Sequence, residues 1–422
     1  MLRTVSTRMI ALSLLIIIPA HAQSELDLQS LIEEALANNP GLQALRHRWE
    51  AEEARIPQAG ALADPMVKFE LSNVPLSDFD FDSTPMSGKQ LMLSQKLPYP
   101  GKRTAKERMA EHSASVAEEA YLDREGIIVN QVKQTYYSLA FLDHAIATTE
   151  KNAELLRDFV RIAETKYSVG RGLQQDVLKA QVTLSGLKNR LITLRQQRRQ
   201  AEAKLNTVLN RLPQAPVGNP ASISQTPFPY DVDTLQKRVL EHRPHLQGIQ
   251  EEIRKWQAAE DLARKEYRPD FTVNLGYRQR DTMVGDPVKG SDFLSLGVAL
   301  NLPIFRDRKQ DQQVKEAKAR RQTAEKRYEG EKQQIFLDVQ DLFLAIQAHG
   351  QQVTLFKTTI IPQADQALHS AVAAYEVDKV DFLTLLNNQI TLFNFEIDYY
   401  RHLTEYEKSL ARMEAIVGER LF

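Results

Sequence analysis

The sequence predicts a mainly helical protein that is written twice, with a small β part in each copy. Ala, Leu, Gln, Glu, Lys and Arg dominate the middle of the chain, a composition typical of long helices and coiled coils. Short segments in each half change from a helical period to alternation of apolar and polar residues, which indicates strands. Similar segments recur in the same order in both halves, which indicates an internal duplication.

The duplication has ordered anchors. Pro40 and Pro244 lie in similar segments 204 residues apart, and Tyr167 and Tyr375 lie in similar segments 208 residues apart. We therefore expect a first repeat at 23–212 and a second at 231–422. The segment 213–230 between them is expected to be an extended linker, because five of the 18 prolines fall within it.

The same order of elements is expected in each repeat. Helices at 27–63 and 232–266 end before Asp64-Pro65 and Arg268-Pro269, because the residue before proline leaves the α region. Alternating strands follow, and long helices then begin. The predicted strands are 65–73, 89–97, 269–280 and 292–302, the predicted long helices start as 103–168 and 308–373, and the predicted hairpin tips are 167–176 and 375–384.

The N-terminus has the pattern of a secretory signal peptide over residues 1–22. Arg3 and Arg8 precede the apolar run Ile10–Ile18, and Ala20-His21-Ala22 is a small-x-small cleavage site. The apolar run is shorter than the roughly 20 residues that a transmembrane helix needs. We therefore expect export, with cleavage after Ala22 and a mature chain that begins at Gln23.

Composition excludes several function classes. The 54 basic and 55 acidic residues balance, and no basic cluster is interleaved with aromatics, so nucleic acid is not an expected partner. The chain has no cysteine, which removes disulfides, thiolate ligands and a lipidated cysteine anchor. No nucleophile motif, phosphate loop or spaced metal-ligand set occurs. We expect no enzymatic activity, no cofactor and no metal site.

Four strands cannot close a membrane barrel, because single-chain barrels have at least about eight. Open strand edges are not tolerated in lipid. If the strands span a membrane, several chains must therefore contribute them to one symmetric assembly. The main alternative is a periplasmic coiled-coil adaptor or scaffold without a pore, for which repeated strands of bilayer length would have no purpose.

The whole pattern resembles the TolC family of outer-membrane efflux ducts. The segments "LSQKLPYPGKR" and "YSVGRGLQQDVLKAQ" are similar to recurring motifs of that family, and "PGKR" at Pro100–Arg103 is closer to its heavy-metal branch. The resemblance implies a homotrimer with a twelve-stranded barrel in outer-membrane lipid and a periplasmic α-barrel of twelve helices. It also implies a passive, gated exit duct that works with a periplasmic adaptor and an inner-membrane transporter.

By the same resemblance, the hairpin tips form the periplasmic entrance and contact the adaptor. The implied contact residues are Val169, Gly170, Arg171, Gly172, Leu173, Val377, Asp378, Lys379 and Val380. A plain helical turn, in which Gly170 only supplies a positive φ, is the simpler alternative. Asp378 and Val380 stand where the first tip has glycines, so the second tip is expected to turn differently.

The resemblance also implies a gate at this entrance. Tyr375 and Asp176 match a tyrosine and an aspartate that hold the family's entrance closed. The family's basic position falls on Val380, with Lys379 beside it, and its acidic ring falls on Thr384 and Asn387. Asp381 is the expected acidic substitute one turn earlier.

Overall fold

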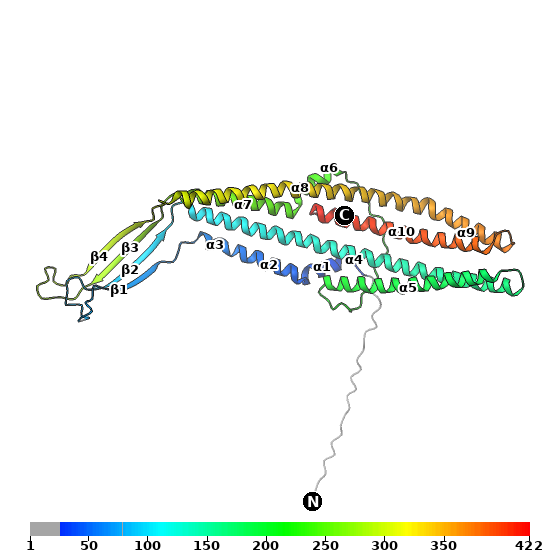
Figure 1. Cartoon of the computed structure of the whole chain (residues 1–422), viewed down its shortest axis with the longest axis horizontal. Coiled ribbons are helices and arrows are strands. Elements are labelled where there is room, and N and C mark those ends of the chain that lie inside the picture. Colours follow the sequence, from blue (N-terminus) through cyan, green and yellow to red (C-terminus); the bar gives the residue numbers. More distant parts are fainter. Residues whose placement is uncertain (1–25, 78) are drawn as a thin grey trace, which may run out of the picture.

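The computed structural model describes residues 26–77 and 79–422, which form a long molecule with a sheet at one end and helical hairpin tips at the other (Figure 1). The mainly helical fold with a small antiparallel sheet is confirmed. The expected signal peptide, residues 1–22, lies outside the described residues. None of the helices in the described part of the chain has the length and apolar composition needed to cross a bilayer.

The duplication is visible in the first helices of each half. Helix α1 (Leu28–Asn38) and helix α6 (Val232–His242) have 11 residues each. The carboxylates of Asp27 and Asp231 cap them by accepting hydrogen bonds from backbone amides at 2.8 Å. Each helix ends just before the proline that starts the next, and the elements that follow are α2 (Pro40–Glu53), α3 (Arg55–Gly60) and α7 (Pro244–Lys265).

The strands form one antiparallel sheet in the order β1-β2-β3-β4. Their bounds are β1 (Met66–Ser72), β2 (Gly88–Leu97), β3 (Phe271–Gln279) and β4 (Phe293–Leu300). Strand β2 of the first half therefore pairs with β3 of the second half, and the two halves share one sheet. The outer edges of β1 and β4 have no neighbouring strand among the described residues.

One face of this sheet is apolar across all four strands. The register aligns Phe69, Leu91, Tyr277 and Leu294 in one row, and the next row is Val67, Leu93, Leu275 and Leu296. These eight side chains are at least 44% exposed, and every residue of β4 is exposed. Residues of the opposite face include Lys68, Gln90, Asn274 and Ser295. The apolar residues that alternate along each strand therefore lie on the same face in all four strands.

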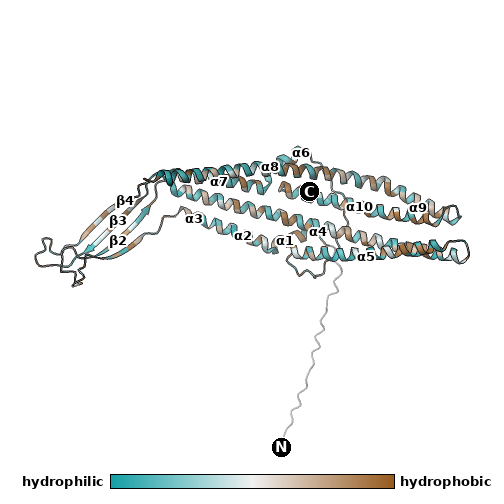
Figure 2. Cartoon of the chain, viewed as in Figure 1, coloured by the Kyte–Doolittle hydropathy of each residue, from teal (hydrophilic) through white to brown (hydrophobic). Residues whose placement is uncertain are grey.

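The helices after the sheet are long. Helix α4 (Lys102–Ser168) has 67 residues, so it is about 100 Å long. It is followed by α5 (Gln174–Val208), and the second half has α8 (Gln310–Leu355), α9 (Ile361–Glu376) and α10 (Phe382–Val417). Figure 2 shows apolar and polar residues mixed along these helices. Their buried residues include many alanines, which let the helices pack closely.

The expected helix at 308–373 is interrupted. A short 3-10 turn (η1, Arg306–Arg308) precedes α8, and a π-helix (η2, Phe356–Ile360) separates α8 from α9. Pro362 lies in the first turn of α9 and cannot donate the hydrogen bond that a continuous α-helix requires. The wider π turn is the local adjustment that accommodates this missing donor.

The segment 213–230 crosses between the two halves; it begins with a turn and contains no helix and no strand of more than one residue. Thr226 donates both its amide and its hydroxyl to the buried carboxylate of Glu407, at 2.8 and 3.0 Å. Its carbonyl accepts a 2.6 Å hydrogen bond from the Tyr406 hydroxyl. Further along, the Tyr230 ring packs against Phe422. The linker is therefore fixed to α10 and to the C-terminal segment.

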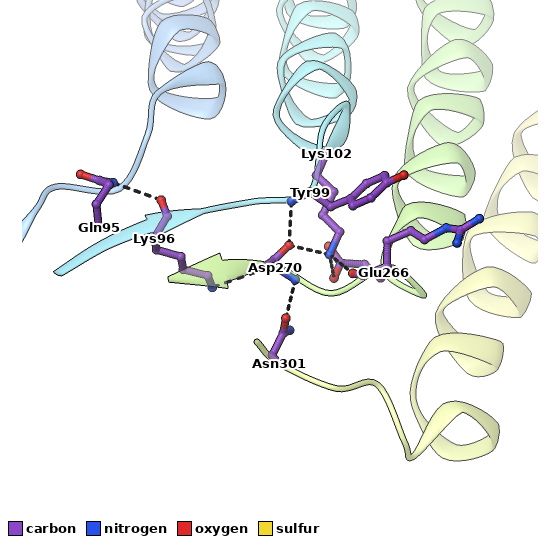
Figure 3. A network of polar contacts seen from close by, with 8 residues as sticks. Gln95, Lys96, Tyr99, Lys102, Glu266, Asp270 and Asn301 are labelled. Atoms are coloured by element: carbon purple, nitrogen blue, oxygen red, sulfur yellow. Dashed lines mark hydrogen bonds and ion pairs between the residues drawn. The ribbon is translucent and has the colours of Figure 1, made fainter. Parts of the chain in front are cut away.

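The sheet joins the helices through a buried ammonium group, that of Lys102 at the start of α4 (Figure 3). Its side chain is 2% exposed. Its Nζ donates to Asp270 Oδ1 at 2.8 Å, to the carbonyl of Arg268 at 2.9 Å and to Glu266 Oε2 at 3.1 Å. These three acceptors match the three protons of the ammonium, so the buried charge is fully hydrogen-bonded.

Asp270 organises the other side of this junction, just before β3. Its Oδ1 also accepts the backbone amide of Tyr99 at 3.0 Å, and its own amide donates to Asn301. Burial raises the pKa of Asp270, but hydrogen bonds from Lys102 and Tyr99 outweigh this effect and leave its pKa below the ordinary value. Because the pKa of Asp270 is lower in the folded state, its carboxylate stabilises the fold. This stabilisation is complete above the ordinary pKa of 3.8 and is lost as the pH falls through the lowered pKa.

Gly101 makes this approach of backbone and side chain feasible. Its φ is +85°, a left-handed conformation that glycine adopts without strain. A Cβ at this position would lie 2.9 Å from Cε of Lys265, which comes from the other half. The Pro100–Arg103 segment is therefore a close contact between the two halves.

We predict that Lys102→Met lowers the free energy of unfolding by about 1.5–3 kcal/mol, because it removes a charged hydrogen-bond donor from the carboxylates of Asp270 and Glu266, which are 13% and 31% exposed. Lys96→Met is the matched control, since the Lys96 ammonium is 59% exposed and 3.9 Å from the same aspartate. That exposed pair contributes about 0–1 kcal/mol. Denaturant unfolding in detergent measures both variants, and equal effects would contradict this account of the junction.

Candidate functional site at the helical hairpin tips

The first hairpin tip is the turn between α4 and α5, at 169–173. Gly170 has φ +75°, its amide donates to the carbonyl of Tyr167 at 3.0 Å, and the amide of Arg171 donates to the carbonyl of Lys166 at 2.9 Å. This pair of hydrogen bonds around a left-handed residue is a Schellman turn. The turn is shorter than the expected tip, 167–176, because α4 continues to Ser168 and α5 begins at Gln174.

The second tip, at 377–381 between α9 and α10, has the same turn. Asp378 has φ +56°, its amide donates to the carbonyl of Tyr375 at 3.2 Å, and the amide of Lys379 donates to the carbonyl of Ala374 at 2.8 Å. The prediction that the second tip turns differently is therefore wrong. Aspartate is one of the few non-glycine residues that enter the left-handed region readily, so it can replace Gly170 here.

A lysine of the first hairpin joins the two tips. Lys166 Nζ donates to the carbonyl of Tyr375 at 3.1 Å and to Oδ1 of Asp378 at 2.6 Å. The same ammonium lies 4.0 Å from the centroid of the Tyr375 ring, in cation–π geometry. Lys166 therefore contacts both the backbone that ends α9 and Asp378, the left-handed residue at which the chain reverses. The hydrogen bond from Lys166, together with its positive charge, lowers the pKa of Asp378.

Tyr375 is held by its ring. The residue is only 9% exposed, and its ring meets Phe382 edge-on at a centroid distance of 5.9 Å. Burial raises the pKa of Tyr375. Asp176 lies in the first turn of α5, directly after the first tip, and is half-buried. The basic group that contacts Tyr375 within the chain is Lys166.

Asp381 is a helix cap. Its Oδ1 accepts a 2.8 Å hydrogen bond from the amide of Thr384 at the start of α10. Hydrogen bonds from Thr384 also lower the pKa of Asp381, so the side chain is ionised at neutral pH. Thr384 and Asn387 are exposed and three residues apart, which places them on one face of α10.

Both tips present apolar side chains at the surface, next to polar ones. Val169, Leu173 and Val377 are 62–66% exposed. Arg171, Asp378 and Lys379 are also exposed. Behind them, residues of both hairpins share one buried cluster, which includes Leu156, Ala163, Ala180, Ala371, Tyr375, Phe382, Leu385 and Leu386. The two tips are therefore packed together within one chain as a single end surface.

Sequence reasoning missed Lys166 and Lys102. Lys166 directly precedes the tip segment, but its partners lie 209 and 212 residues away, so no local pattern identifies them. Lys102 lies within the "PGKR" segment, whose similarity to a family motif marked the place without giving a role. Among the described residues, no group of three or more metal-ligating His, Asp or Glu side chains comes together.

The sheet has one exposed apolar face and, among the described residues, no strand beside either outer edge, and it is joined to helical hairpins whose longest helix, α4, is about 100 Å long. Residues 31–211 and 235–419 match the family described as outer membrane efflux protein. The chain belongs to this family. Its family and fold are those of channel proteins.

Individual relatives agree with this assignment. The cobalt-zinc-cadmium resistance protein CzcC of Cupriavidus metallidurans is 26% identical over 412 residues, which cover 96% of this chain and 93% of that protein. Among solved structures, the outer membrane protein VceC of Vibrio cholerae is similar with a TM-score of 0.78 at 20% identity, over 94% of this chain and 97% of that one. CusC is similar with a TM-score of 0.77 at 18% identity, over 93% and 92%.

We predict that Gly170→Ala destabilises the first tip by about 1–2 kcal/mol, because a Cβ is disfavoured in the left-handed region. Gly186→Ala is the control, since Gly186 is helical and has open space around its Cβ position. Hydrogen–deuterium exchange of peptides that span residues 160–180 is expected to rise in the first variant only. Unchanged exchange in Gly170→Ala would show that the tip does not need the left-handed residue.

Proposed function

We propose that the protein is the outer-membrane exit duct of a tripartite efflux system. The observation that carries this proposal is the sheet, whose apolar face is exposed over four strands while neither edge has a partner strand within the described part of the chain. A large exposed apolar face marks a surface that contacts a membrane or another protein. Unpaired edges are not tolerated in lipid, so the sheet requires further strands.

A homotrimer satisfies both requirements. Strand β4 of one chain pairs with β1 of the next, and three chains form a closed barrel of twelve strands. The row that contains Phe69 and Leu294 then faces outer-membrane lipid, and the row that contains Lys68 and Ser295 faces the lumen. The helices continue the duct as a periplasmic α-barrel, and the N-terminal export signal supports this location.

In this assembly the hairpin tips are the periplasmic entrance. The exposed side chains of Val169, Leu173 and Val377 offer apolar contacts, and Arg171 and Lys379 offer charged ones. This mixture suits a periplasmic adaptor protein, which would connect the duct to an energy-supplying transporter of the inner membrane. The duct itself is passive and hydrolyses nothing.

The tips also form the gate. The bonds from Lys166 to Tyr375 and Asp378 join both hairpins of each chain, and Asp176 follows the first tip in the first turn of α5. Thr384 and Asn387 are exposed next to the second tip and take the place of an acidic ring. Asp381, whose carboxylate caps α10, adds a fixed negative charge close to that ring.

The proposed substrates are heavy-metal ions or small toxic compounds. The similarity to a cobalt-zinc-cadmium resistance protein over 96% of the chain supports divalent metal ions first. Deletion of the gene, followed by growth tests on cobalt, zinc, cadmium and common drugs, tests this proposal. Increased sensitivity that the intact gene restores is expected. Unchanged sensitivity to metals and increased sensitivity to drugs would contradict the metal assignment only.

Cell fractionation separates the duct from the alternative of a pore-free periplasmic scaffold. A duct is expected in the outer-membrane fraction and is released only by detergent. Recovery in the soluble periplasmic fraction would contradict the duct and favour the scaffold.

We predict that Lys166→Gln raises the single-channel conductance in planar bilayers, because it removes the ion pair to Asp378 and the cation–π contact with Tyr375. Lys179→Gln is the control, since Lys179 is exposed on the same hairpin. Identical conductance of both variants and the unchanged protein would show that Lys166 does not hold the entrance closed.

We predict that Leu296→Arg destabilises the assembled protein by about 2–4 kcal/mol, the cost of a cation on the lipid face near the membrane midplane. Ser295→Arg, on the opposite face of the same strand, is expected to cost much less. The yield of heat-resistant oligomer after folding into lipid vesicles measures both. Equal yields would contradict the assignment of the two faces.

A further inference from the structure

The connection between α8 and α9 is built to bend. At the end of the π-helix η2, the amide of Ile361 donates to the carbonyl of Phe356, which closes a turn wider than an α-helical one. Pro362 follows directly and has no amide hydrogen to donate. The hydroxyls of Thr354 and Thr358 donate to carbonyls one turn earlier, at 3.0 and 2.8 Å, and such bonds often bend helices. This connection is therefore easier to bend than a continuous α-helix.

The matching segment of the first half is continuous and well packed. At the spacing of 208 residues that relates the two tips, η2 matches 148–152, which lies inside α4. Thr149 and Asn152 are buried there, at 0% and 3% exposure. Oδ1 of Asn152 accepts a 2.5 Å hydrogen bond from Gln389 of α10, which is also buried. At the level of the bend, α10 is therefore bound to α4 by a buried polar contact.

The part of α9 next to η2 is loosely packed. The structure describes all of the residues 354–370, and none of them is buried within the chain, whereas Val353 and Ala371 on either side are buried. A groove of about 330 Å³ lies between this part of α9 and α10, with Ala364 on one wall and Phe395 on the other. This part of α9 therefore has room to move against α10.

The far end of α9 is fixed at the tip. Ala371 and Tyr375 belong to the buried cluster that both hairpins share. The Tyr375 ring meets Phe382, and its carbonyl accepts the hydrogen bond from Lys166. Helix α9 has 16 residues, so it is about 24 Å long. It is thus an arm with a bendable segment at one end and a small set of tip contacts at the other.

We propose that η2 is a hinge about which α9 swings relative to α10 when Lys166 releases the tip. Helix α10 stays against α4, because the buried pair Asn152–Gln389 holds it there. The two helices of the second hairpin therefore do not move as one body. The role of this swing in opening the entrance rests on the proposed gate, but the hinge is a property of each chain and is measured without a pore.

Distances between spin labels test the hinge in the full-length protein in lipid vesicles. The chain has no cysteine, so labels attach only at introduced cysteines. Arg161→Cys with His369→Cys joins α4 to α9, at side chains that are 77% and 78% exposed. Arg161→Cys with Asn394→Cys joins α4 to α10 at exposed positions. An excess of unlabelled chains makes distances within one chain dominate.

The hinge predicts one narrow distance for each pair when Lys166 is unchanged. Lys166→Gln is expected to add a second distance for the α4–α9 pair only. Adding Pro362→Ala is expected to remove this second distance, because alanine supplies the missing amide donor and stiffens the connection. Lys179→Gln, on the exposed surface of the first hairpin, is expected to leave both distances as they are.

Three results would each overturn the hinge: no second distance in Lys166→Gln, a second distance that persists with Pro362→Ala, or an equal change for the α10 label. If Lys166→Gln raises the conductance without a second distance, the proposed gate stands and only the hinge fails.

Hydrogen–deuterium exchange gives an independent measurement on the unchanged protein. The hinge predicts that amides at 354–370 exchange faster than those of the matching segment 146–162 in α4, because local opening costs less where nothing is buried. Equal exchange of the two segments would contradict it.

Discussion

The fold depends on the buried ammonium of Lys102. A buried charge without partners would cost far more than the stability of a typical domain, so this lysine is acceptable only because three oxygens accept its protons. All three acceptors belong to the second half, whereas Lys102 starts the long helix of the first half. The interaction therefore fixes the two copies to each other at the point where four strands become helices. Gly101 and the Asp270 hydrogen bonds complete this constraint.

Away from that junction, packing is divided along the molecule. One apolar cluster is formed mainly by the first half, with Ile128 and Leu205, but also includes Ile397 of α10. A second contains Val339 and Met413 of the second half, and a third at the tips joins both halves. The sheet has no such core, because its apolar side chains point outward. Each chain is therefore well packed in its helices and leaves apolar surface and hydrogen-bonding edges free in its strands. Those free groups are the physical reason to propose an assembly of several chains.

Much of this architecture could be predicted from local patterns. Strands such as β3 alternate cleanly, and Pro65 and Pro269 mark the ends of the preceding helices, so their positions were predictable to within a few residues. The first tip was found from its two glycines. The shape of the second tip was predicted wrongly, because Asp378 adopts the left-handed conformation that was expected only of a glycine. Lys102 and Lys166 bind residues from distant segments of the chain, and a single sequence does not show which distant residues come together.

The central claim is that a single chain has an incomplete sheet that is closed by further copies. Native mass spectrometry of the detergent-purified protein tests it most directly, because it counts chains without assuming a pore or a substrate. The account predicts a dominant species with three times the mass of one chain. A dominant monomer or dimer under conditions that preserve the β-structure would contradict it.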